Sequence, residues 1–122
     1  EKKKQYRYSE LVENVIHVLD EDYLQEISLE ELARKQYVSS SYLRRVFVRE
    51  VGFSAMEYIT VLRMERAKDL LTSTSEKVTS IAQRLGYNND SYFIKTFRGM
   101  VGVTPYEYRK QAHNSRKKEV TL

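Results

Sequence analysis

The chain has 122 residues, a formal net charge of +4, no cysteine and two histidines. Without cysteine it forms neither disulfides nor thiolate metal sites, and His17 and His113 are too far apart in sequence to indicate a metal or catalytic site. No stretch approaches the roughly 18 apolar residues of a membrane helix, and no apolar segment follows the basic residues at the start. We therefore expect a cytoplasmic protein without cofactor that is not an enzyme.

The acidic residues are concentrated near the start. Residues 10–31 contain eight carboxylates and no Lys or Arg, so all 21 basic residues lie elsewhere, among nine acidic ones. Segregated charge of this kind suits a polyanionic partner, although a solvated surface also accounts for it.

The first predicted element is an amphipathic helix over about 10–20, because apolar residues recur there at three- and four-residue steps. Ser28 then begins a capping box with Glu31, which marks the start of a short helix that ends near Lys35.

A third helix follows a short turn. Ser39 and Ser40 can each cap its start, and Gly52 ends it. The next helix is longer, about 54–71, and carries apolar residues on more than one side, so we expect it to contact more than one neighbour.

The order then repeats. A helix, a turn and a second helix are predicted at about 78–85, 86–89 and 90–101. Pro105 opens a last short helix at its first position. Residues 113–122 have no periodicity and are expected to form a flexible tail, and residues 1–7 are expected to be the remnant of a linker.

The two halves of the chain are similar in sequence. Residues 28–58 match residues 77–108 at an offset of 49 or 50, as shown by Ala33 and Ala82, Phe47 and Phe97, and Gly52 and Gly102. An internal repeat indicates how a fold is built from similar units. Two copies suit a protein whose partner itself has a repeating structure, such as the helical turns of duplex DNA.

Each copy has the pattern of a helix-turn-helix, at about 28–52 and about 77–102. The predicted fold is therefore all-α, with seven helices and two helix-turn-helix units joined by a long linker helix. A linker of about 18 residues is about 27 Å long, which is comparable to the ~34–36 Å between successive major grooves on one side of B-DNA.

The apolar pattern also predicts which side chains of the second helix in each unit face outward. With Leu43, Val46 and Phe47 inward, the outward residues of the first unit are Ser40, Ser41, Arg44 and Arg45. In the second unit they are Asn89, Asp90, Ser91, Ile94 and Lys95.

The linker LRMERAKDLL and the segment IAQRLGYNNDSYFIKTFRGMVGVTPYEYR carry a family resemblance. They are similar to the DNA-binding domain of the AraC/XylS family of bacterial transcription regulators. The match runs from about residue 28 to about residue 110, which implies one such domain over 8–112. The resemblance implies a double-stranded DNA partner, two bridged helix-turn-helix units and binding near promoters.

Carried over by position, the resemblance implies base contacts by Ser40, Ser41, Arg44, Arg45, Asn89, Asp90, Ser91 and Lys95. Arg44 and Arg45 are the strongest candidates, because arginine can bind guanine O6 and N7 bidentately. Phosphate contact or solvated charge is the alternative for each. Asp90 is better explained as a helix cap than as a reader of cytosine.

Phosphate contacts are expected from backbone N–H groups at helix starts and from the side chains of Arg49, Tyr92 and Arg98. The enzyme alternative within this resemblance is DNA-repair methyl transfer, which needs nucleophilic cysteines that the chain lacks.

Family members usually join this domain to a ligand-binding or receiver domain, so we expect a C-terminal fragment that lacks its N-terminal effector or receiver domain. The acidic helix at 10–20 would then contact that domain or RNA polymerase. The remaining alternative is a helical protein-interaction module with little DNA specificity of its own.

Overall fold

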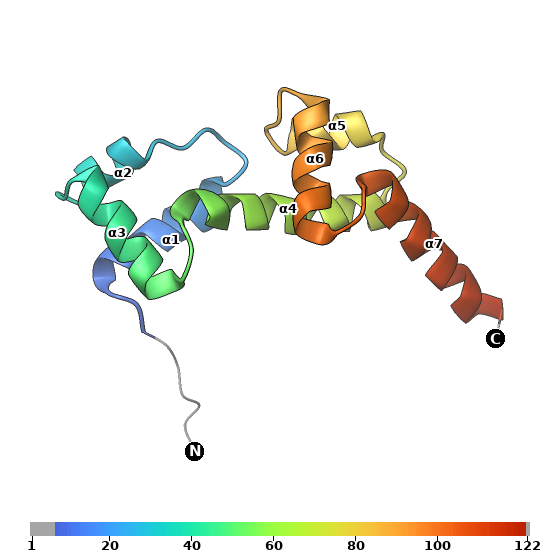
Figure 1. The fold of residues 1–122 in the computed structure, drawn as a ribbon, viewed down its shortest axis with the longest axis horizontal. Coiled ribbons are helices and arrows are strands. Elements are labelled where there is room, and N and C mark those ends of the chain that lie inside the picture. The colour runs from blue at the N-terminus through green and yellow to red at the C-terminus, as the bar shows by residue number, and fades with distance from the viewer. Residues whose placement is uncertain (1–6, 122) are drawn as a thin grey trace, which may run out of the picture. The chain divides into compact units, whose positions relative to one another are not determined.

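The computed structural model describes residues 7–121, with side chains over 7–116. Over this range the chain forms seven α-helices and no strand, which confirms the predicted all-α fold (Figure 1). The helices are α1 Glu10–Asp22, α2 Leu29–Lys35, α3 Ser40–Val51, α4 Ala55–Ser73, α5 Val78–Arg84, α6 Asp90–Val101 and α7 Pro105–Thr121. The linker remnant expected at 1–7 lies outside the described residues except for Arg7.

The chain divides into two compact units, one up to Val61 and the other from Leu62. Each unit has a hydrophobic core of its own. Ala55 and Ile59 of α4 belong to the first core, whereas Met64 and Ala67 of the same helix belong to the second. Because α4 serves both cores, it is apolar on more than one side, as its sequence predicts.

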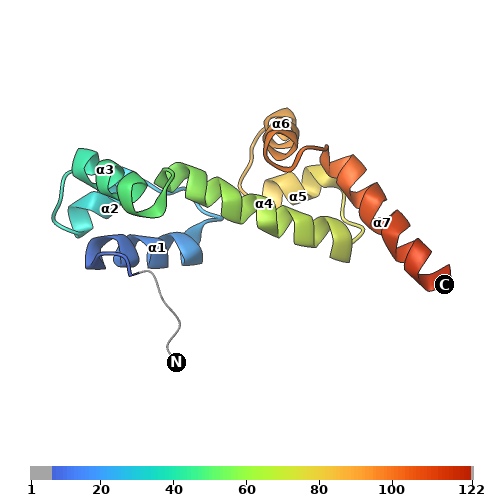
Figure 2. The same ribbon diagram turned by 60° about the horizontal axis from the view of Figure 1, so that its bottom comes forward.

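The first core forms where α1 and α2 pack against α3, and Figures 1 and 2 show α1 lying alongside α3. The ring of Tyr58 lies edge-on against Phe47, with the ring centroids 5.9 Å apart. Its hydroxyl donates a hydrogen bond to Asp20 at 2.7 Å. Burial and this hydrogen bond raise the pKa of Tyr58. Tyr58 therefore links α4 to both α1 and α3.

The second core repeats this aromatic contact. Tyr108 lies edge-on against Phe97 with the centroids 5.6 Å apart, and Phe97 in turn contacts Phe93. The guanidinium of Arg63 lies over the ring of Tyr87, 5.4 Å from its centroid. The tyrosines at matched positions thus pack at the edge of each core.

Matched glutamates cap α4 and α7, the helices that follow α3 and α6. Ser54 N–H donates to Glu57 while Glu57 N–H donates to the Ser54 hydroxyl, both at 3.0 Å. Thr104 and Glu107 make the same reciprocal pair. The backbone hydrogen bond from Thr104 lowers the pKa of Glu107. Both glutamates are structural caps of the capping-box type.

The turn between the two helices of each unit has the same hydrogen bonds. Val38 N–H donates to the Ala33 carbonyl and Tyr87 N–H donates to the carbonyl of the matched alanine of the repeat, Ala82, both at 3.0 Å. Such a turn requires a left-handed residue after the first helix. Gly86 supplies it in the second unit with φ 93°, whereas Tyr37 supplies it in the first with φ 63°.

Replacing Tyr37 with glycine is expected to stabilise the first unit by about 0.5–1 kcal/mol. A side chain in the left-handed region costs about 1–2 kcal/mol, and the greater freedom of glycine in the unfolded chain offsets only part of the gain. Little packing is lost, because the Tyr37 side chain is 95% exposed. Urea unfolding measures the change. At the matched position of the second unit, Gly86→Ala places a side chain in the left-handed region and should destabilise that unit. A Tyr37→Gly variant that is less stable than the parent chain would contradict the expected gain.

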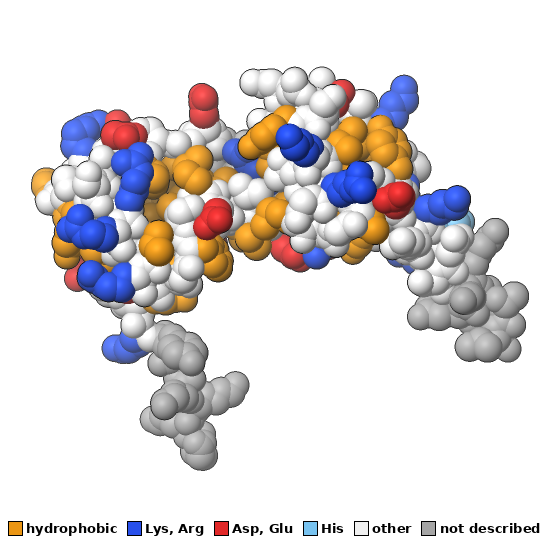
Figure 3. Space-filling model, in the orientation of Figure 1, with side chains coloured by type: hydrophobic (Ala, Val, Ile, Leu, Met, Phe, Trp, Pro, Cys, Tyr) orange, Lys and Arg blue, Asp and Glu red, His pale blue; other side chains and the backbone are white. Residues whose placement is uncertain are grey.

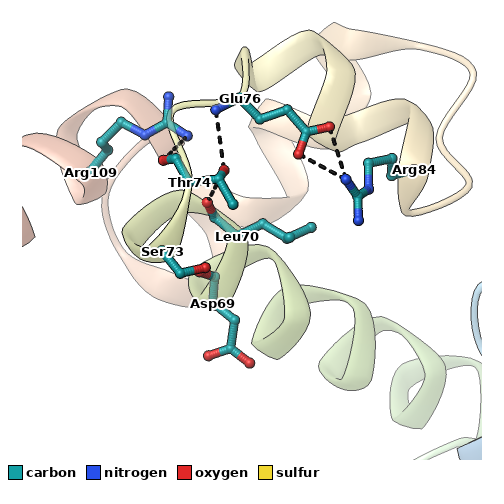
Figure 4. Close-up of polar contacts among 7 residues, drawn as sticks. All are labelled: Asp69, Leu70, Ser73, Thr74, Glu76, Arg84 and Arg109. Atoms are coloured by element: carbon teal, nitrogen blue, oxygen red, sulfur yellow. Dashed lines mark hydrogen bonds and ion pairs between the residues drawn. The ribbon is translucent and has the colours of Figure 1, made fainter.

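The junction between α4 and α5 is fixed by polar contacts around Thr74 (Figure 4). The Thr74 hydroxyl donates to the Leu70 carbonyl at 2.6 Å and accepts from the Glu76 N–H at 3.2 Å. Arg109 of α7 donates to the Thr74 carbonyl, and the Glu76 carboxylate binds Arg84 at 3.0 Å. These contacts hold the start of α5 against the end of α4.

Helix α7 is longer than the sequence predicts. It continues to Thr121, through most of the segment that is expected from the sequence to form a tail, 113–122. The segment after Pro105 contains no glycine or further proline, and its many basic residues are good helix formers. Arg116 also donates to the Thr72 carbonyl at 3.3 Å, a contact that no periodicity reveals.

Candidate nucleic-acid interface

Helix α3 presents its predicted polar face to solvent. Ser39 caps it by accepting from the Tyr42 N–H at 3.1 Å. Leu43, Val46 and Phe47 are buried, as expected from the apolar pattern. Of the candidate base-reading residues, Ser41, Arg44 and Arg45 are exposed and Ser40 is half-buried. The first unit therefore brings its four candidates to one end and one face of a helix.

The two arginines of this face each have a neighbour. Arg44 donates to Glu30 of α2, with 3.1 Å between Nη2 and Oε2. The guanidinium of Arg45 lies 5.6 Å from the ring centroid of Tyr42, one turn earlier on α3. The pKa of Glu30 is lowered, first by its own backbone N–H and then by Arg44. Sequence reasoning missed both neighbours.

Basic side chains gather over α2 and α3 on the face shown in Figure 3. The exposed basic residues of these two helices are Arg34, Lys35, Arg44, Arg45 and Arg49. No acidic residue is buried among the described residues, and the acids of this unit lie mainly on α1 and the first turn of α2. Together α2 and α3 carry five basic and three acidic side chains, and this net positive charge suits a polyanionic partner.

Helix α6 presents a less basic face. Ser91 and Lys95 are exposed, whereas Ile94 is half-buried against the second core. Asn89 caps the helix by accepting from the Tyr92 N–H at 2.9 Å, so the cap expected at Asp90 is wrong. Asp90 is the first helical residue instead, because Asn89 has the extended backbone of a cap and its side-chain oxygen accepts from the Tyr92 N–H.

A shallow groove of about 570 Å³ follows the outer face of α6. It is lined by Ser91, Ile94, Lys95, Arg98, Gly99 and Thr104. The candidate phosphate-binding residues Arg49, Tyr92 and Arg98 are all exposed, on α3 and α6. Arg98 lies in the groove with Lys95, so the second unit brings two cations to the face that its pattern predicts.

Two other kinds of site are not found in the part of the chain that the structure describes. It contains no group of three or more His, Cys, Asp or Glu side chains that could hold a metal ion. None of its helices is long and apolar enough to cross a membrane.

Two helix-turn-helix units, each with an exposed polar face on its second helix, define the class of this protein as a double helix-turn-helix domain. Residues 32–111 match the helix-turn-helix domain family. The chain is 35% identical to the uncharacterized HTH-type transcriptional regulator YtdP of Bacillus subtilis, over 86% of this chain and 14% of that protein. The chain spans well under half the length of the curated relatives it matches.

Solved structures agree with this. The C-terminal domain of AraT, a response regulator from Geobacillus stearothermophilus, is 35% identical with a TM-score of 0.81, over 86% of this chain and 88% of that one. A transcriptional regulator with an AraC-type DNA-binding domain from Chromobacterium violaceum is 26% identical with a TM-score of 0.75, over 84% and 91%. The chain belongs to the AraC family of transcription regulators, which is a family of regulators and not of enzymes.

Proposed function

We propose that this domain binds double-stranded DNA sequence-specifically, with α3 and α6 in successive major grooves, and so regulates transcription at bacterial promoters. The exposed arginine pair of α3 carries the proposal. An α-helix fits the major groove, and arginine on its outer face can read guanine there. Arg49, Tyr92 and Arg98 would bind phosphates and fix the register.

The length of α4 supports the use of two grooves. The helix has 19 residues, which correspond to about 28 Å of rise. Successive major grooves on one side of B-DNA are ~34–36 Å apart, a spacing comparable to this length. One chain would thus do what a pair of helix-turn-helix subunits does elsewhere.

The reading faces differ, so the target would be asymmetric. Arg44 and Arg45 of the first unit correspond in the repeat to Ile94 and Lys95 of the second. A hydrophobic side chain favours the methyl group of thymine, whereas arginine favours guanine. We therefore infer that α3 supplies most of the base recognition.

Protein partners are proposed as well. Two of the similar structures are the C-terminal domains of response regulators, AraT and the two-component regulator yesN of Fusobacterium nucleatum. We propose that this domain likewise works with an N-terminal effector or receiver domain. The exposed carboxylates Glu10, Glu13 and Glu21 of α1 would face that domain or RNA polymerase rather than DNA.

Selection of binding sites from random duplexes tests the function. The chain is expected to enrich an asymmetric sequence with two segments about one helical turn, or ~10–10.5 base pairs, apart. A variant with both Arg44 and Arg45 changed to alanine should lose the first segment and keep the second. Enrichment of one short segment would mean that a single unit reads. No enrichment at all would favour the protein-interaction module instead.

A further inference from the structure

Arg44, the strongest candidate for base recognition, forms an ion pair with a residue of the neighbouring helix α2. Its Nη2 lies 3.1 Å from Oε2 of Glu30, which stands in the first turn of α2, 14 residues earlier. We propose that Glu30 is a positioning residue that orients the Arg44 guanidinium for base reading. The inference rests on the proposed function and names a specificity residue within it.

Stability does not account for this ion pair. The two side chains are 51% and 68% exposed, and pairs in such positions contribute little to folding. An arginine side chain carries about 2 kcal/mol of rotamer entropy, which binding must remove. A carboxylate that restricts the side chain beforehand reduces this loss on binding. The benefit of the pair therefore lies in binding and not in folding.

The carboxylate also directs Arg44 away from non-specific contacts. A free guanidinium on this face can swing to any phosphate and gain sequence-independent affinity. Glu30 competes with phosphate for the same N–H groups and repels phosphate itself. Arg44 is thereby kept for a base edge, where a bidentate partner can replace the carboxylate.

The repeat offers an internal comparison. In the second unit the positions of Glu30 and Arg44 are occupied by Thr79 and Ile94. That unit has neither the arginine nor the acid, although the helix-turn-helix frame is the same. Arg45, whose position keeps a basic residue in both copies, has no acidic partner among the described residues and lies over the ring of Tyr42 instead. The acidic residue is therefore present in the copy that has the arginine and absent from the copy that lacks it.

A matched pair of variants tests the proposal. Glu30→Ala and Glu31→Ala each remove one carboxylate from the first turn of α2, but Glu31 pairs with Arg34 on its own helix and not with Arg44. Binding is titrated against the selected duplex, its single-base variants and a random duplex at one salt concentration. Glu30→Ala is expected to reduce discrimination at the base pair read by Arg44 by about three- to tenfold, the size expected for ordering one long side chain. Each variant should bind random DNA more tightly than the parent chain, because each loses one negative charge. Glu31→Ala, however, should leave discrimination between bases unchanged.

Further variants separate positioning from general effects. Glu30→Gln keeps an acceptor for Arg44 and should restore part of the discrimination. Glu30→Ala combined with Arg44→Ala should discriminate no less than Arg44→Ala alone. If Glu30→Ala and Glu31→Ala behave alike at every base pair while the parent chain still discriminates, the positioning role is wrong and the proposed function stands. If the parent chain shows no base preference at all, both are wrong.

Discussion

Replacing Phe97 with alanine is expected to lower the free energy of unfolding of the second unit by about 3–5 kcal/mol. Phe97 is fully buried in α6 and contacts Phe93 on its own helix and Tyr108 on α7. The change removes apolar surface from the core and leaves a cavity that the surrounding helices fill only in part. Urea unfolding followed by circular dichroism measures the loss.

The location of the damage checks the two-core architecture. Phe47 occupies the same position of the repeat in the first core, where Tyr58 packs on it. Amide hydrogen exchange should show lost protection in α5, α6 and α7 for Phe97→Ala, and in α1, α2 and α3 for Phe47→Ala. Met100→Ala, on the exposed side of α6, should change stability by no more than about 0.5 kcal/mol. Loss of protection in the same helices for both phenylalanine variants would contradict separate cores.

Replacing Arg44 with alanine is expected to weaken binding to the selected site by about 1–3 kcal/mol and to relax the preference at one base pair. The guanidinium is exposed on the outer face of α3, two turns before the helix ends at Gly52. Removing a side chain that contacts a base edge lowers the affinity for one sequence more than for others, whereas removing a phosphate contact lowers the affinity for all sequences alike. Titration against the site and its single-base variants measures both quantities.

Arg49→Ala is the matched control, since it removes the same charge from the same helix. Arg49 lies in the last turn of α3, where we expect a phosphate contact. Its loss should weaken binding to all sequences alike and reduce the dependence of log K on log salt by about one unit. Equal losses on specific and random DNA for Arg44→Ala would instead assign Arg44 to the backbone.

The order and type of the helices could be predicted from local sequence. Ser28 with Glu31, Ser54 with Glu57, and Thr104 with Glu107 all mark helix starts by short-range hydrogen bonds. Such contacts span three residues, so they are visible in the sequence before any packing is known. The inward and outward faces of α3 follow from the same local periodicity.

Contacts over longer spans could not be predicted. Arg116 binds a carbonyl 44 residues earlier, in support of a helix where the sequence shows only an aperiodic basic tail. The cap of α6 could not be predicted either, since both Asn89 and Asp90 fit the local sequence pattern. In the structure Asn89 has the extended backbone of a cap, and Asp90 does not serve as the cap. The left-handed backbone of Tyr37 was hidden as well, since tyrosine gives no signal for it and only Gly86 in the other copy does.

The sequence by itself determined the repeat, the all-α frame and the outward placement of Arg44 and Arg45. These depend on spacings of three, four and fifty residues along one chain, and helix geometry converts such spacings directly into faces. Only the tertiary structure decided that Arg44 meets Glu30 while Arg45 stacks on Tyr42. The turn at Tyr37 brings the first turn of α2 beside α3, and no periodicity within either helix encodes which side chains then meet.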